Sequence, residues 1–208
     1  MQNKILEIYK QLYKKRGHPK NQWVLWCKNP KTIKEREEVI IGSILTQQTN
    51  WKNVEKAIKN LKFANCVRLE RIYNLGKKKP EKLKNLIRPS GFYNIKTKYL
   101  INIARFFVQN GGVAKFLKSK QMVHDLRSMI HNVHGVGQET ADSILLYALD
   151  KPVFVIDEYT KRFARKEGIS KTLSYSHLQR LFEKSLTKDF KLYQIFHALI
   201  VINGQKKQ

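Results

Sequence analysis

A glycine-rich turn and an aspartate downstream of it are the residues of this sequence best suited to chemistry. The turn, Gly135-Val136-Gly137, leads directly into a stretch with an apolar stripe, and Asp157 follows in the run Val155-Ile156-Asp157. Such a turn leaves backbone N–H groups free at the start of a helix, where they can bind a phosphate. A carboxylate near a phosphate anchor indicates chemistry on a nucleic acid rather than binding alone.

The charge of the chain supports a polyanionic partner. The 208 residues contain 41 Lys and Arg against 16 Asp and Glu, a formal net charge of +25, and lysines and arginines that neutralise phosphates release counterions. A membrane is the competing partner, but no stretch approaches the roughly 18 apolar residues of a spanning helix. The N-terminus also lacks the apolar core of a signal peptide. We therefore expect a cytoplasmic, nucleoid-associated protein with no membrane partner.

The spacing of apolar residues predicts an all-α protein. We expect an N-terminal helix that stops near Gly17, apolar helical bands at 39–45 and 54–61, a helix after the glycine turn, and further helices near 66–75, 80–88, 94–109, 122–132, 158–167, 174–187 and 189–203. Breaks are expected at Pro89-Ser90-Gly91 and Gly111-Gly112. Residues 153–156 are expected to be extended, since Pro152 ends the helix before them.

Four segments together resemble the endonuclease III, or helix-hairpin-helix-GPD, superfamily of DNA glycosylases. Residues 133–142 resemble its hairpin, and residues 155–157 resemble its catalytic-aspartate segment. Residues 44–50 and 87–94 resemble two further family segments, in the same order along the chain. The similarity covers about residues 35–203. Within the superfamily, the segment Arg88–Asn94 and the acidic residue at 139 resemble the 3-methyladenine DNA glycosylase III branch.

The resemblance implies two helical subdomains flanking a DNA-binding cleft. Residues 35–150 are expected to form a six-helix barrel-type domain, with the helix-hairpin-helix at about 122–149. Residues 1–34 together with 151–208 are expected to form a second helical domain that carries the catalytic Asp157. The implied partner is double-stranded DNA containing a damaged base, bound by a monomer.

Two acidic residues define the expected chemistry. By resemblance, Asp157 faces the sugar of a flipped nucleotide, where it can stabilise positive charge on the deoxyribose and orient or deprotonate water. Asp157 is also suited to cap the helix that follows it. Bifunctional members of the superfamily have a lysine at the position of Glu139, and its amine forms a Schiff base. A carboxylate cannot form that imine, so the resemblance implies a monofunctional enzyme in base excision repair, with an alkylated purine such as 3-methyladenine as substrate.

The expected DNA contacts lie in three segments. Gln47 occupies the place where family members fill the gap left by the flipped base. Gly135 and Gly137 allow positive φ angles and a close approach of the backbone, so that their N–H groups can hold a DNA phosphate. The full set of DNA-binding predictions is Gln47, Asn94, Lys96, Lys98, Gly135, Val136, Gly137 and Thr140.

The base pocket is expected to be aromatic. Trp23 and Trp26 precede the first barrel helix, where the resembled branch has tryptophans, and an electron-rich ring attracts a cationic alkylated base. Phe92 and Tyr159 are weaker candidates, and either tryptophan would serve equally well as core. We assign no catalytic role to His134, and we expect His197 to be a hydrogen-bonded core residue.

No cofactor is expected. Many relatives have a four-cysteine iron–sulfur loop after a segment like residues 196–201, but this chain has only Cys27 and Cys66. Two alternative functions remain at this stage. One is a bifunctional glycosylase and abasic-site lyase for oxidised pyrimidines, and the other is a non-catalytic DNA-binding module that has kept only the hairpin.

Overall fold

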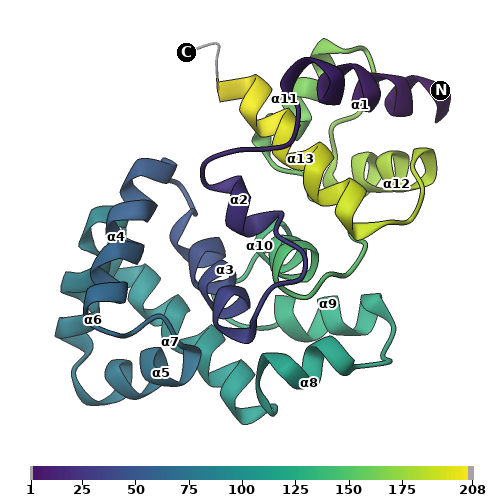
Figure 1. The fold of residues 1–208 in the computed structure, drawn as a ribbon. Helices are drawn as coiled ribbons and strands as arrows, with labels where there is room; N and C mark the ends of the chain where they lie inside the picture. Colours follow the sequence, from purple (N-terminus) through teal and green to yellow (C-terminus); the bar gives the residue numbers. More distant parts are fainter. Residues whose placement is uncertain (1, 206–208) are drawn as a thin grey trace. The chain divides into compact units, whose positions relative to one another are not determined.

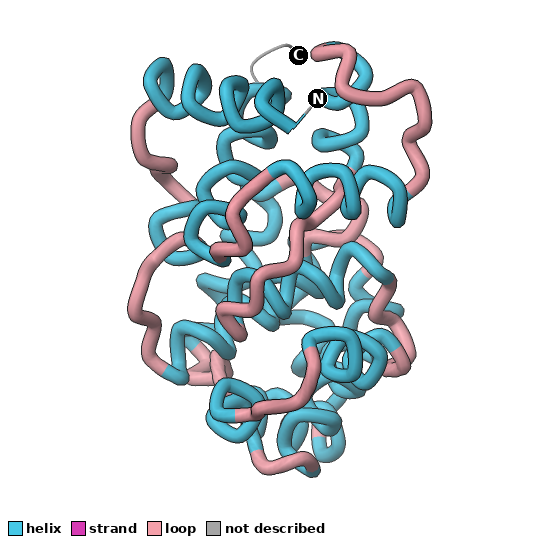
Figure 2. Tube along the Cα trace, turned by 90° about the vertical axis from the view of Figure 1, so that its right-hand side faces the viewer, coloured by secondary structure: helices cyan, strands magenta, loops and turns pink. Residues whose placement is uncertain are grey.

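The protein is all-α, as the apolar spacing predicted. The computed structural model describes residues 2–205, and these contain helices and connections with no strand (Figures 1 and 2). They divide into two compact units. One consists of Pro30–Ile144, and the other of Met1–Asn29 together with Leu145–Gln208. No helix among the described residues is long and apolar enough to cross a membrane.

The unit Pro30–Ile144 is built around one buried helix. This helix, α3 (Ile33–Leu45), begins with a capping box in which Thr32 and Glu35 satisfy each other's backbone N–H groups. Its last seven residues are all buried, and it contacts α4, α7, α8 and α10. The other helices of this unit are α4 (Trp51–Phe63), α5 (Leu69–Lys78), α6 (Pro80–Ile87), η1 (Arg88–Ser90), α7 (Tyr93–Gln109), α8 (Gly112–Lys118), α9 (Val123–His131) and α10 (Gln138–Ser143).

The second unit is built around α13 (Phe190–Gln205), whose residues 196–201 are all buried. Its other helices are α1 (Gln2–Arg16), α2 (Trp23–Trp26), α11 (Glu158–Lys166) and α12 (Tyr175–Ser185). The two ends of the chain meet in this unit, because α1 packs against both α12 and α13 (Figure 1). The segment that carries Asp157 is therefore enclosed by helices from both ends of the sequence.

Three short elements were not predicted from the sequence. Helices α2 and α8 are too short for an apolar period to be detected. Gly111, at φ +89°, and Gly112, at φ +75°, reverse the chain between α7 and α8. After α10 the helix widens into a π-helix, η2 (Ile144–Ala148), before Pro152. Wide turns of this kind interrupt helices mostly at functional sites.

Candidate functional site

Asp157 lies at the N-terminal end of α11 and caps it. Its backbone is extended, and its Oδ1 accepts a hydrogen bond of 2.7 Å from the N–H of Thr160. Capping and chemistry are compatible, since each carboxylate oxygen has two lone pairs and the cap uses one of them. The cap fixes the orientation of the carboxylate relative to the helix.

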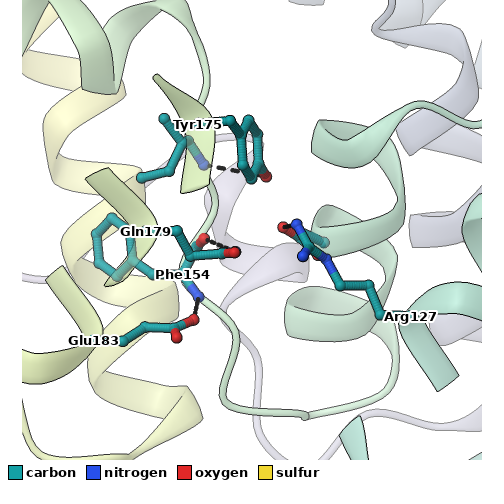
Figure 3. A network of polar contacts seen from close by, with 7 residues as sticks. Arg127, Phe154, Tyr175, Gln179 and Glu183 are labelled. Atoms are coloured by element: carbon teal, nitrogen blue, oxygen red, sulfur yellow. Dashed lines mark hydrogen bonds and ion pairs between the residues drawn. The ribbon is translucent and has the colours of Figure 1, made fainter. Parts of the chain in front are cut away.

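The extended residues before Asp157 are held by one face of α12 (Figure 3). The N–H of Phe154 donates to Glu183 Oε1 at 2.9 Å, and its carbonyl accepts from Gln179 Nε2 at 2.8 Å. Farther along, the N–H of Ile156 lies 3.5 Å from the hydroxyl of Tyr175. Tyr175, Gln179 and Glu183 are four residues apart, so they share a face of the helix. Their side chains supply the hydrogen-bond partners that this buried, extended backbone would receive from a neighbouring strand in a β-sheet.

The second oxygen of Asp157 faces a buried histidine. Asp157 Oδ2 lies 3.4 Å from His197 Nε2, and His197 Nδ1 lies 2.8 Å from the hydroxyl of Tyr147. Burial alone would raise the pKa of Asp157. The charge of His197 and the hydrogen bonds from His197 and Thr160 outweigh burial, so that the pKa is lowered below its ordinary value. The carboxylate is therefore ionised at neutral pH although it is only 14% exposed.

Trp23 and Trp26 pack around this histidine and tyrosine. The ring of Trp23 lies 5.7 Å from that of Tyr147 and 6.0 Å from that of His197, and Trp26 lies 5.1 Å from Tyr147. Each tryptophan is only 7% exposed. Little of either ring is left to stack on a base, so the observed contacts are those of core residues that exclude water from His197.

The hairpin consists of α9, the glycine turn and α10, and its two glycines differ. Gly135 has φ +96°, and a Cβ atom there would collide with the ring of Tyr99. Gly137 instead has φ −80° and ψ 176°, so only Gly135 uses the positive φ that both glycines allow. A Cβ at Gly137 would meet nothing within 4 Å. The fold requires glycine at position 135. At position 137 the glycine leaves the backbone at the start of α10 uncovered by any side chain of its own.

A buried ion pair joins the two helices of the hairpin. The guanidinium of Arg127 on α9 binds both oxygens of Asp142 on α10, at 2.6 and 2.8 Å (Figure 3). Asp142 is completely buried, and Arg127 is 27% exposed. A bidentate pair fixes both distance and angle. It therefore sets the geometry at which the glycine turn is presented.

Gln47 ties the end of α3 to the hairpin. Its amide nitrogen donates to the carbonyl of Gly135 at 3.0 Å and to Thr140 Oγ1 at 3.1 Å. The side chains of Thr140 and Val136 are buried, and the N–H of Val136 donates to the carbonyl of Val133 at 2.9 Å. The prediction of a phosphate contact is therefore not supported for Val136, whose only backbone donor is already used. A groove of about 640 Å³ runs along this region, lined by Gln47, Gln48, Phe92, Ile95, Lys96, Tyr99 and residues 135–140.

The three residues predicted to contact phosphate at the start of α7 separate into two groups. Asn94 and Lys98 are exposed. Lys96 is 1% exposed, and its Nζ donates to the carbonyls of Leu45 at 2.8 Å and Ser90 at 2.7 Å. Burial lowers the pKa of Lys96 to about 8. The prediction of a phosphate contact was wrong for Lys96, because its ammonium group joins the ends of α3 and η1 inside the fold.

The remaining candidates differ in accessibility. Phe92 is 62% exposed, has φ +47° and lines the groove beside Gln47, so it belongs with the hairpin residues. Tyr159 is half-buried, with the guanidinium of Arg162 4.8 Å above its ring. Glu139 is exposed in the first turn of α10, on the same groove.

Sequence reasoning missed the residues that hold Asp157. His197 was expected to be a core residue, and Tyr147 and the face of α12 were not singled out. One signal was available, namely the spacing of three polar residues, Tyr175, Gln179 and Glu183, on one helix face. The contact of Tyr147 with His197 left no such signal, because it joins residues 50 apart in the sequence.

The side chains do not fit an iron–sulfur cluster. Cys27 is buried, Cys66 is half-buried, and neither forms a disulfide, whereas the cluster requires four cysteines. Among the described residues, no group of three or more His, Cys, Asp or Glu is arranged to hold a metal ion.

Two sequence relatives resemble most of the chain. It is 45% identical over 204 residues to a protein of Methanocaldococcus jannaschii described as a DNA repair glycosylase, covering 97% of this chain and 87% of the relative. It is 30% identical over 162 residues to endonuclease III of Thermotoga maritima, covering 77% and 70% of the two chains.

Solved structures have the same fold. The crystal structure of Helicobacter pylori 3-methyladenine DNA glycosylase bound to 1,N6-ethenoadenine matches with a TM-score of 0.81 at 29% identity, covering 98% of both chains. A trapped covalent complex of endonuclease III with DNA matches with a TM-score of 0.75 at 18% identity, over 99% and 87% of the chains, a likeness of fold alone. Residues 41–188 match the family of HhH-GPD superfamily base excision DNA repair proteins, and the chain belongs to that family of DNA glycosylases.

Proposed function

We propose that this DNA glycosylase is monofunctional and removes alkylated purines, such as 3-methyladenine, from double-stranded DNA. The observation that carries the proposal is the Asp157 carboxylate. It is held ionised at the end of a fixed segment, in a cluster from which aromatic rings exclude water. A preorganised anion of this kind stabilises developing positive charge strongly, because it needs little reorganisation.

The reaction divides between the base and this carboxylate. The bond between C1′ and the purine nitrogen breaks, and its electron pair leaves with the base, which becomes neutral if it was cationic. Positive charge develops on the sugar and is stabilised by Asp157. Water then adds to C1′ and loses a proton to Asp157 or to solvent, which leaves an abasic site. An alkylated, cationic purine needs no general acid, so one carboxylate is sufficient.

Two lysine positions support hydrolysis over lyase chemistry. Position 139, where the resemblance places a lysine in bifunctional enzymes, is a glutamate. Lys96 lines the hairpin groove, but its amine is occupied by two backbone carbonyls. A buried amine that donates to two carbonyls is not free to attack C1′.

The substrate class rests on the likeness to the H. pylori enzyme, whose structure contains an ethenoadenine. Because Trp23 and Trp26 are nearly buried, we propose that they mainly pack around His197 and Tyr147. At most, the edge of one ring contacts the base. Phe92 and Gln47, which share the hairpin groove, are proposed to enter the DNA where the nucleotide leaves the stack. The backbone N–H groups of Gly135 and Gly137, with Asn94 and Lys98, are proposed to bind phosphates.

The test is base release from methylated duplex DNA, with the products separated by chromatography and a borohydride trap run in parallel. We expect free 3-methyladenine, intact strands bearing abasic sites and no trapped adduct. A covalent adduct would show an amine nucleophile and a bifunctional enzyme. DNA binding without the release of any base would indicate a non-catalytic module.

A further inference from the structure

His197 and Tyr147 form a buried polar pair that the proposed reaction does not use. Both come from the core of their unit, since His197 lies in the middle of α13 and Tyr147 in η2, and they are 4% and 0% exposed. His197 Nε2 faces Asp157 Oδ2 at 3.4 Å, an ion-pair distance, and has no hydrogen-bond partner in the free protein. A core histidine of purely structural value would have both nitrogens satisfied.

The hydrogen-bond partners of His197 and Tyr147 indicate where their protons lie. The ionised carboxylate of Asp157 only accepts hydrogen bonds, so the facing Nε2 must carry hydrogen. The hydroxyl of Tyr147 donates to the carbonyl of Gln194, 3.1 Å away, and its oxygen can accept a hydrogen bond from Nδ1–H of His197 at 2.8 Å. Burial raises the pKa of Tyr147 well above its ordinary value, so the phenol keeps its proton.

We infer that His197 is a positioning residue for Asp157, with the Tyr147 hydroxyl holding the imidazole ring so that Nε2–H points at the carboxylate. The inference rests on the proposed role of Asp157. The 3.4 Å contact is loose, as such contacts often are before substrate binds. Oδ1 is held by the N–H of Thr160 and Oδ2 by His197. The carboxylate plane is therefore fixed from two sides.

The same contact should set the acid limb of the activity profile. The titratable side chains that face Asp157 are His197 from α13 and Tyr147 from η2, while Cys27, after α2, acts on Tyr147. Thr160 on α11 contributes only hydrogen bonds. Removing the donor at Nε2 should let the pKa of Asp157 rise, so that activity falls off at a higher pH than in the wild type.

Side-chain geometry supplies a sharp set of variants. In His197→Gln the amide nitrogen replaces Nε2 and can still donate to Asp157, whereas in His197→Asn it replaces only Nδ1. Tyr147→Phe removes a single oxygen and leaves the ring in place. Tyr193→Phe is the matched control, because Tyr193 is a buried tyrosine of the same unit whose hydroxyl lies 3.5 Å from the carbonyl of Glu183.

The experiment measures single-turnover base release from methylated duplex DNA against pH, with thermal melting to confirm that each variant is folded. We expect the maximal single-turnover rate to fall about tenfold or more in His197→Asn and about tenfold in Tyr147→Phe, with the half-saturating enzyme concentration little changed, as for other residues that orient a catalytic ligand. His197→Gln should recover most of the loss, and Tyr193→Phe should match the wild type. The acid limb should move to higher pH in His197→Asn alone.

Nitrogen NMR of His197 in the free protein supplies a readout that does not depend on catalysis. We expect hydrogen on Nε2 both in the wild type and in Tyr147→Phe. Wild-type rates and pH profiles in folded His197→Asn and Tyr147→Phe, beside an inactive Asp157→Asn, would overturn the positioning role. If Asp157→Asn itself is fully active, the proposed function fails. The NMR measurement still decides the contact, since an Nε2 atom without hydrogen would refute it.

Discussion

The hairpin and the Asp157 cluster carry the two halves of the proposed task, and they are constructed in different ways. The hairpin presents backbone, and the side chains that shape it, Arg127, Asp142 and Gln47, bond to one another and to the turn. The Asp157 cluster presents one side chain, and everything around it is aromatic or hydrogen-bonded and nearly closed to water. In the proposed function, the hairpin binds DNA of any sequence and the Asp157 cluster acts on one nucleotide.

This difference explains which substitutions each region should tolerate. Backbone groups that bind phosphate carry no sequence information, so the hairpin depends on the shape of its turn and on the absence of side chains there. The Asp157 cluster depends on the hydrogen-bonding capacity of individual atoms, where a single oxygen can matter. The two regions can therefore be compared with substitutions that change either the shape of the turn or the hydrogen bonds of a side chain, but not both.

The largest loss of stability is expected when the buried ion pair of the hairpin is broken. Asp142→Ala leaves the Arg127 guanidinium without its carboxylate, which should lower the free energy of unfolding by about 3–5 kcal/mol. Asp125→Ala is the control, because Asp125 lies on α9 with its side chain 59% exposed, and it should change stability by less than about 0.5 kcal/mol. Urea denaturation of both variants measures the difference, and equal effects would show that the pair does not hold the hairpin.

The two glycines of the turn should separate folding from binding. Gly135→Ala forces a side chain into a left-handed backbone and into Tyr99, so it should destabilise the protein by about 1–3 kcal/mol. Gly137→Ala should melt like the wild type but bind undamaged DNA roughly 10–100-fold more weakly, the cost of losing a hydrogen bond to a charged group. Thermal melting and fluorescence anisotropy measure the two effects. If Gly137→Ala binds DNA as tightly as the wild type, the turn does not bind a phosphate.

Gln47 should contribute modestly to the folded state and more to the complex. Gln47→Ala removes two hydrogen bonds to the hairpin, an expected loss of about 1 kcal/mol in the free energy of unfolding. If the side chain also enters the DNA, base release should fall more than DNA binding does. A variant with unchanged single-turnover rates would restrict Gln47 to its observed role in joining α3 to the hairpin.

The smallest expected effect is the pH dependence of stability that comes from Asp157. Its pKa is lower in the folded protein than the value of about 3.9 in an unfolded chain. The unfolded chain therefore binds this proton first, and the stabilisation is fully present above about pH 4 and lost as pH falls through the folded pKa. Urea unfolding of the wild type and Asp157→Asn should show a gap that narrows in acid. A gap that widens there would contradict the lowered pKa.

Helices with a clear periodic spacing of apolar residues could be predicted from the sequence. The positions of the glycine turn and of Asp157 along the chain could be predicted too. Long amphipathic helices such as α7 and α13 have enough turns for their pattern to emerge. The sequence could not show that Lys96 is buried, because a lysine at the start of a helix is usually solvated, and only the fold brings the carbonyls of Leu45 and Ser90 to its amine. The φ of Gly137 was equally hidden, since glycine is compatible with either sign.

The support of Asp157 was out of reach for a similar reason. His197 and Tyr147 each match an apolar helix, and nothing in their neighbourhoods indicates that they meet. The tryptophans show the converse. Their types suggested stacking on a base, whereas their burial against Tyr147 and His197 gives them a place in the core.

The central claim is that the Asp157 carboxylate performs the chemistry while the hairpin binds the DNA, and one paired measurement tests it directly. Asp157→Asn and Glu158→Gln remove neighbouring negative charges, one in the cluster and one exposed on α11. On methylated duplex DNA under single turnover, Asp157→Asn should release base roughly 10²–10⁴-fold more slowly while binding DNA at least as well as the wild type. Glu158→Gln should match the wild type. Undiminished release by a folded Asp157→Asn would contradict the account.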